Sequence, residues 1–243
     1  MPIIAIAGVS IGYAHGKKSL PPNSPSGPVD PVNFAVPRHI ATIPLLNQYG
    51  QRTDLSAFHG RVIVLADFMT SCQEECPITT GALLDVRRSL AAAKLLIKVS
   101  IVEVSVDATR DIPSRLLAYS KEFGVPFTLL TGTSKNLAEL WKWFGVYYER
   151  VKEGTPPDIN WQNGKPYTFD IVHTDDVFIL GASGRERGVV QANADVDGKI
   201  PRALASLLDA DGRQDLNNPG FGSWTPAEML QAVGGVLGYS IKR

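Results

Sequence analysis

A run of apolar residues that ends at a pair of cysteines constrains the fold of this chain more than any other feature. Residues 61–68, Arg-Val-Ile-Val-Leu-Ala-Asp-Phe, are almost continuously apolar, as strands buried in parallel sheets are. A doubly wound nucleotide-binding fold would follow such a strand with a glycine-rich phosphate loop. Here Cys-Gln-Glu-Glu-Cys-Pro stands at residues 72–77 instead. The run therefore predicts an α/β sheet and disfavours nucleotide binding.

Helices and strands are expected to alternate after this strand. A short strand and turn with Gly50 is expected over 43–51, before the apolar run. The expected helices cover 77–96, 112–123, 134–144 and 199–209, and the expected strands cover 99–106, 127–130, 172–180 and 187–193. Gly181-Ala-Ser-Gly184 joins the last two strands into a hairpin. Because parallel strands need crossover helices and a hairpin needs none, the order predicts a mixed sheet with helices on both faces.

Two expected helices carry local end signals. Ser134 is expected to cap the helix that ends at Gly145. Thr225, with Glu228 three residues later and Pro226 at the first helical position, forms a capping box for a terminal helix to about residue 236.

The chain divides into three regions. Residues 1–39 combine a short apolar start with a proline-rich linker, 40–210 form the globular domain, and 211–243 are a C-terminal extension with a short helix. The apolar start, 3–13, is shorter than the ~20 residues of a membrane-spanning helix and lacks a basic leader. It is interpreted as the remnant of an export or anchor segment, as an amphipathic arm or as an extra strand.

Charge and cysteine content exclude two classes of protein. The 24 basic and 24 acidic residues give a net charge of zero, so a nucleic-acid partner is not expected. Only two cysteines are present, which excludes a disulfide-rich scaffold.

Both cysteines, Cys72 and Cys76, lie where the buried strand leads into a helix. At this spacing the two sulfurs can form a disulfide or bind one metal ion. The helix N-terminus favours a thiolate, whereas the adjacent Glu74 and Glu75 disfavour one. A structural disulfide or two buried thiols is the plainer interpretation, but so short a loop gains little stability from a disulfide.

Histidine is the next candidate ligand, and four are present. His15 and His39 belong to the linker region, and His59 precedes Gly60 in an expected surface turn. His173 follows Asp170-Ile-Val at the start of the expected hairpin, beside the cysteine loop. It is either a third ligand or a structural histidine.

Two thiolates and one imidazole suit a soft, copper-type ion, whereas a structural zinc site needs a fourth ligand. Asp107 or Asp170 could orient the imidazole, or could cap the ends of strands.

Several segments, in order and spacing, resemble one protein family. They are Phe68-Met-Thr-Ser-Cys72-x-x-x-Cys76-Pro77, Val104-Ser-Val-Asp107-Ala-Thr-Arg110-Asp111-Ile-Pro113, Leu129-Leu-Thr-Gly132, Phe144-Gly-Val-Tyr-Tyr148, and His173-Thr174 with Gly184 in the hairpin. They resemble the Sco/SenC family, thioredoxin-like copper-binding proteins that assemble cytochrome c oxidase. The resemblance covers about residues 43–208.

The resemblance implies that Cys72, Cys76 and His173 bind copper, as Cu(I) or Cu(II), in a thioredoxin-like α/β domain. It also implies a metallochaperone, tethered to a membrane outside the cytoplasm, in the periplasm or on the outer face of the cytoplasmic membrane. Its partner would be a cytochrome c oxidase subunit or another copper or thiol protein. The same cysteines would form a redox-active disulfide.

Two other hypotheses remain open. In a thiol-disulfide oxidoreductase, Cys72 would attack a disulfide and Cys76 would resolve the mixed disulfide. In a non-catalytic thioredoxin-like module, the terminal extensions would bind a partner.

Overall fold

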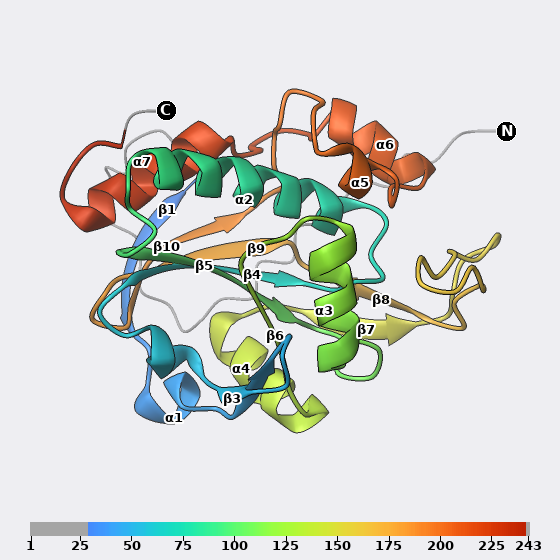
Figure 1. Cartoon of the computed structure of the whole chain (residues 1–243), viewed down its shortest axis with the longest axis horizontal. Helices are drawn as coiled ribbons and strands as arrows, with labels where there is room; N and C mark the ends of the chain where they lie inside the picture. The colour runs from blue at the N-terminus through green and yellow to red at the C-terminus, as the bar shows by residue number, and fades with distance from the viewer. Residues whose placement is uncertain (1–28, 242–243) are drawn as a thin grey trace, which may run out of the picture.

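A mixed β-sheet forms the centre of the computed structural model, which describes residues 29–241 (Figure 1). Its eight strands lie in the order β1-β10-β9-β4-β5-β6-β2-β3, and β7 pairs separately with β8. The strands are β1 (Asp30–Ala35), β2 (Leu45–Asn47), β3 (Arg52–Thr53), β4 (Val62–Phe68), β5 (Val99–Ser105), β6 (Thr128–Thr131), β7 (Tyr148–Val151), β8 (Asp170–His173), β9 (Asp176–Leu180) and β10 (Arg185–Gln191). The mixed α/β sheet expected from the sequence is confirmed.

The helices connect these strands on both sides of the sheet. They are α1 (Arg38–Ala41), α2 (Glu75–Ala92), α3 (Pro113–Glu122), α4 (Ser134–Phe144), α5 (Arg202–Ala205), α6 (Ala210–Asn217) and α7 (Pro226–Leu237), with a 3-10 turn, η1 (Leu55–Phe58). No helix within residues 29–241 combines the length and hydrophobicity needed to cross a lipid bilayer.

The central strand β4 is buried along its whole length. It runs parallel to β5 and antiparallel to β9. Apolar residues on both of its faces are therefore shielded, which explains the unbroken apolar run.

Aromatic contacts show which helices cover which face. Phe68 at the end of β4 contacts Tyr119 of α3. On the opposite face, Phe178 pairs with Leu65 in the sheet and contacts Phe144 of α4. Since side chains alternate along a strand, odd-numbered residues of β4 face α4 and even-numbered residues face α3.

The segment expected to be a linker contains an edge strand. β1 pairs antiparallel with β10, so the expectation of a linker is wrong for Asp30–Ala35. Pro31 is compatible with this position because an edge strand leaves one row of backbone N–H groups unpaired. The apolar start and the other prolines before residue 29 lie outside the described residues.

Three local predictions also need correction. The helix expected over 199–209 is only the short α5, and a separate helix, α6, begins after it, because Asp209 caps α6 by accepting a hydrogen bond from the Gly212 N–H. Thr133 rather than Ser134 caps α4. The strand expected over 172–180 is divided into β8 and β9.

The C-terminal extension packs onto the domain. The capping box of Thr225 and Glu228 is confirmed at the start of α7. Trp224, Met229 and Val233 are fully buried, and α7 lies beside α2 (Figure 1). The extension therefore contributes to the core.

One carboxyl group lies in the core between β5 and α2. Glu103 is 1% exposed and accepts a hydrogen bond from Thr80 Oγ1 (2.7 Å). Burial raises the pKa of Glu103 to about 8. Its neutral form is therefore the one that the fold favours at neutral pH.

We expect Glu103→Gln to remove a pH dependence of stability. In the unfolded chain Glu103 loses its proton near its ordinary pKa of 4.5, whereas the folded protein keeps that proton up to about 8. The stabilisation from neutral Glu103 is complete below pH 4.5, and the free energy of unfolding falls by on the order of 5 kcal/mol as pH rises to about 8. Urea unfolding at about pH 5 and about pH 8.5 should show a smaller loss for Glu103→Gln than for the native chain. The exposed control Glu122→Gln should match the native loss, and an equal loss in all three proteins would contradict this account.

Candidate metal centre

The cysteine loop joins the end of β4 to the start of α2. Cys76 is buried in the first turn of α2, and Cys72 is partly exposed in the loop before it. The Cys76 backbone N–H donates a hydrogen bond to the Cys72 sulfur (3.4 Å). Both cysteines are free thiols, so both sulfurs are available for metal binding or thiol exchange.

The β7–β8 ribbon brings His173 to this loop. His173 is the last residue of β8 and pairs with Tyr148 of β7. Its Nε2 atom lies 3.4 Å from the Cys76 sulfur. The ligand atoms of Cys72, Cys76 and His173 all lie within 4.8 Å of one another, so the structure brings together the three residues predicted from the sequence.

Asp67 fixes the orientation of the His173 ring. Nδ1 of His173 lies 2.7 Å from Asp67 Oδ2 and 2.8 Å from the Thr174 carbonyl oxygen, both acceptors. The other Asp67 oxygen accepts a hydrogen bond from the Asp176 N–H (2.7 Å). These acceptors place a ring proton on Nδ1, so Nε2 is the ring nitrogen that faces the sulfurs.

The prediction that Asp107 or Asp170 orients the His173 ring is wrong, because Asp67 and Thr174 do so. Asp107 accepts hydrogen bonds from Arg110 and from the Thr109 N–H instead. Asp170 begins β8, at the opposite end of the strand from His173. The signal that could have identified Asp67 is its position as the only charged residue within an apolar strand.

The segment between β7 and β8, residues 152–169, forms a wall beside the cysteine loop. Trp161 Nε1 donates to the Thr70 carbonyl (2.8 Å), and Gln73 Nε2 donates to the Ile159 carbonyl (2.7 Å). Arg115 donates to both Thr70 Oγ1 (2.6 Å) and the Tyr167 hydroxyl (2.7 Å). No sequence motif pointed to this wall, because each contact joins segments that lie far apart in the chain.

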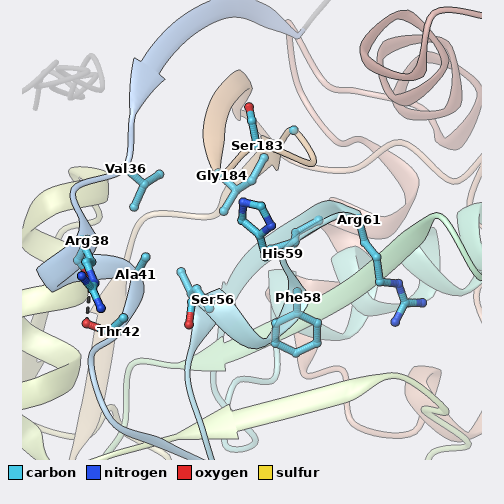
Figure 2. A pocket seen from close by; sticks show the side chains of 14 residues that line it. Val36, Arg38, Ala41, Thr42, Ser56, Phe58, His59, Arg61, Ser183 and Gly184 are labelled. Carbon is cyan, nitrogen blue, oxygen red and sulfur yellow. Dashed lines mark hydrogen bonds between the residues drawn. The ribbon is translucent and has the colours of Figure 1, made fainter.

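His39 and His59 lie away from the site. His59 lines an open pocket of about 320 Å³ with Arg38 and Phe58 (Figure 2). This pocket lies beside the start of β4, whereas the cysteines follow its end. The six steps from Val62 to Phe68, at about 3.3 Å each, span about 20 Å. His39 lies in α1, and His15 lies outside the described residues.

The SCO1/SenC family model matches residues 37–209, which include all three residues of the site. The chain belongs to the SCO1/SenC family. A SCO2-like protein of Rickettsia conorii is 27% identical over 141 residues, which make up 58% of this chain and 63% of that protein. The match therefore spans somewhat less than two thirds of the length of this relative.

Two solved structures share the fold of this SCO1/SenC chain. A putative electron transfer protein from Aquifex aeolicus has a TM-score of 0.57 at 18% identity, covering 85% of this chain and 94% of that one. Arabidopsis thaliana ScoI, solved with copper bound, has a TM-score of 0.54 at 20% identity, covering 69% of this chain and 91% of that one.

The two thiols of the SCO1/SenC site differ in acidity. The hydrogen bond from the Cys76 thiol, helped by His173, lowers the pKa of Cys72 well below its usual range despite burial. Burial and the neighbouring Cys72 sulfur raise the pKa of Cys76. The partly exposed Cys72 is therefore the sulfur that more readily carries a negative charge.

Carboxylates surround the imidazole in this SCO1/SenC site. Burial alone would lower the pKa of His173, but Asp175, 3.9 Å from Nδ1, and the hydrogen bond to Asp67 raise it well above its usual value. The side chains of Asp67 and His173 are 0% and 4% exposed, so this pair is screened little by water.

We expect Asp67→Asn to lower the pKa of His173, because it removes one of the carboxylates that stabilise the protonated ring. NMR titration of the ring in metal-free protein measures this pKa. Asp170→Asn is the matched control, since Asp170 lies on the same strand as His173 but at its opposite end. An unchanged His173 titration in Asp67→Asn would show that Asp67 does not hold the ring.

Proposed function

We propose that the chain binds one copper ion through Cys72, Cys76 and His173 and passes it to a partner protein. The observation that carries this proposal is the direction of the imidazole. Asp67 and Thr174 accept at Nδ1 while Nε2 faces the Cys76 sulfur. A histidine whose second nitrogen is fixed in this way is typical of a metal ligand.

The donor set fits copper in number and chemistry. Three donors bound about 2.0–2.3 Å from one ion lie about 4 Å apart, compatible with the separations of up to 4.8 Å in this structure. Two thiolates and one imidazole favour soft ions such as Cu(I) and also accommodate Cu(II). Arabidopsis ScoI, a protein of the same fold, has been solved with copper bound.

Delivery to another protein is supported by the exposure of the site. Cys72 is partly exposed, whereas Cys76 is buried. An incoming thiolate can therefore reach the ion from the Cys72 side. We propose that the recipient is the copper site of a cytochrome c oxidase subunit, or of another copper or thiol protein, outside the cytoplasm. A tether formed by the N-terminal region would keep the domain near a membrane-bound recipient.

Copper titration of the reduced protein tests the binding proposal. The native chain should bind about one copper ion, and Cys72→Ser, Cys76→Ser and His173→Ala should each weaken binding by at least about tenfold. Competition with a Cu(I) chelator measures the affinity. His59→Ala, which changes the histidine beside the distant pocket, is the matched control and should bind as the native chain does. Native affinity in the His173→Ala variant would remove the imidazole from the site.

The acidity of Cys72 favours a second candidate function, thiol-disulfide exchange. In this reaction the Cys72 thiolate attacks a substrate disulfide and one substrate sulfur leaves. Cys76 then attacks Cys72, which releases the second substrate thiol and oxidises Cys72 and Cys76 to a disulfide.

A disulfide-reduction assay in the absence of metal distinguishes the two functions. If exchange is the principal activity, metal-free protein should turn over a model disulfide with an added thiol reductant, and Cys72→Ser should abolish turnover. If copper transfer is the principal activity, we expect turnover near the uncatalysed rate. The reduced thiol content of the native chain, measured first, is the control for prior oxidation.

A further inference from the structure

We propose that helix α6 holds the loop between the two cysteines in its metal-binding shape, with Gly212 as the positioning residue. This inference rests on the proposed copper binding. The helix begins at Ala210, one residue beyond the segment that the SCO1/SenC model matches. Figure 1 shows α6 above the N-terminal end of α2, where the cysteine loop lies.

Gly212 lies in direct contact with the backbone of the cysteine loop. A Cβ atom at this position would be 2.4 Å from the Gln73 carbonyl oxygen and 2.9 Å from Glu74 Cα. Both are backbone atoms, which cannot move aside as the end of a flexible side chain can. Glycine is therefore required for α6 to approach the loop as closely as it does.

A hydrogen bond fixes the same contact. The Asp209 N–H, at the start of α6, donates to the Gln73 carbonyl (3.0 Å). The Asp209 side chain accepts from the Gly212 N–H (2.7 Å) and so caps the helix. The capping residue Asp209, Gly212 and the hydrogen bond to Gln73 all belong to the first turn of α6. Removing the cap should therefore also weaken the contact that holds the cysteine loop.

The rest of the loop is held from other sides. The Gln73 side chain donates to the Ile159 carbonyl (2.7 Å). Asn193 Nδ2 donates to the buried Glu75 carboxylate (2.6 Å), and the Asn193 carbonyl accepts from the Trp224 N–H (3.0 Å). All three residues between the cysteines are thus contacted from outside the loop. Gly212 of the C-terminal extension contacts Gln73 and Glu74 directly, whereas Asn193, which holds Glu75, is linked to the extension through the Trp224 N–H.

This arrangement affects the metal through the distance between the two sulfurs. The loop backbone determines where Cys72 lies relative to Cys76, which the rigid helix α2 holds. A site whose ligands are already in place loses less conformational entropy when it binds an ion. Residues that orient ligands typically change metal affinity by about 10- to 100-fold when they are substituted.

Gly212→Ala in the full-length chain tests the inference. We expect Cu(I) affinity, measured with a competing chelator, to fall by about tenfold or more. The Cu(II)–thiolate absorption band should shift, and the alkylation rate of Cys72 in metal-free protein should change severalfold. Gly235→Ala is the matched control, because it adds the same methyl group to α7 where no atom lies within 4 Å, and it should behave as the native chain does.

A second pair of variants applies if Gly212→Ala does not fold. Asp209→Ala removes the cap of α6 and should reproduce the three changes in a milder form. Asp209→Asn keeps a capping oxygen while removing the charge, and should restore native behaviour.

The outcomes separate this inference from the proposed function. If native protein binds no copper, the proposed function fails, whereas altered Cys72 alkylation in Gly212→Ala would still support the role of α6. If native protein binds copper and folded Gly212→Ala retains its affinity, absorption band and alkylation rate, the inference is overturned. With an unfolded Gly212→Ala, native behaviour of Asp209→Ala overturns it.

Discussion

The hydrogen bond between Asp67 and His173 is the interaction on which the site depends. It joins residues 106 positions apart, one in the central strand and one on the β7–β8 ribbon. Asp67 is fully buried, and a buried carboxylate without partners is strongly destabilising. His173 and the Asp176 N–H supply those partners. The hydrogen bonds that offset the free-energy cost of burying this carboxylate therefore also position the imidazole beside the two cysteines.

Local signals explain which parts of the fold could be predicted from the sequence. The apolar run, the capping box at Thr225 and the strand-to-helix position of the cysteines each depend on neighbouring residues, and each is found in the structure. Strand β1 was missed because Pro31 and the prolines around the strand suggest a linker, and only pairing with β10 makes the segment a strand. Asp67 was missed because its partner is distant in sequence. The position of His173 was predicted, but the ribbon that carries it was not.

The contacts that hold the cysteine loop could not be predicted from the sequence at all. Gln73 is held by Ile159, Glu75 is held by Asn193, and Gly212 packs against the backbone of Gln73 and Glu74. A glycine in a polar helix has no local pattern that reveals its purpose; what matters is the backbone that approaches it. The two cysteines of the loop could thus be recognised as a candidate site from their spacing, whereas the surroundings that fix their geometry could only be found in three dimensions.

The charges around the site favour a cation, although the whole chain has a net charge of zero. Burial is the first cause that raises the pKa of Asp175 and Glu75 to about 8 and that of Asp176 to about 7, and neighbouring acidic groups add to each shift. Carboxyl groups crowded near two thiols resist ionising together, because each new negative charge repels the others. A positive ion held by the sulfurs and Nε2 would offset that repulsion, whereas an anionic ligand would add to it. Electrostatics and the arrangement of the three donor atoms therefore both support the proposed metal binding at this site.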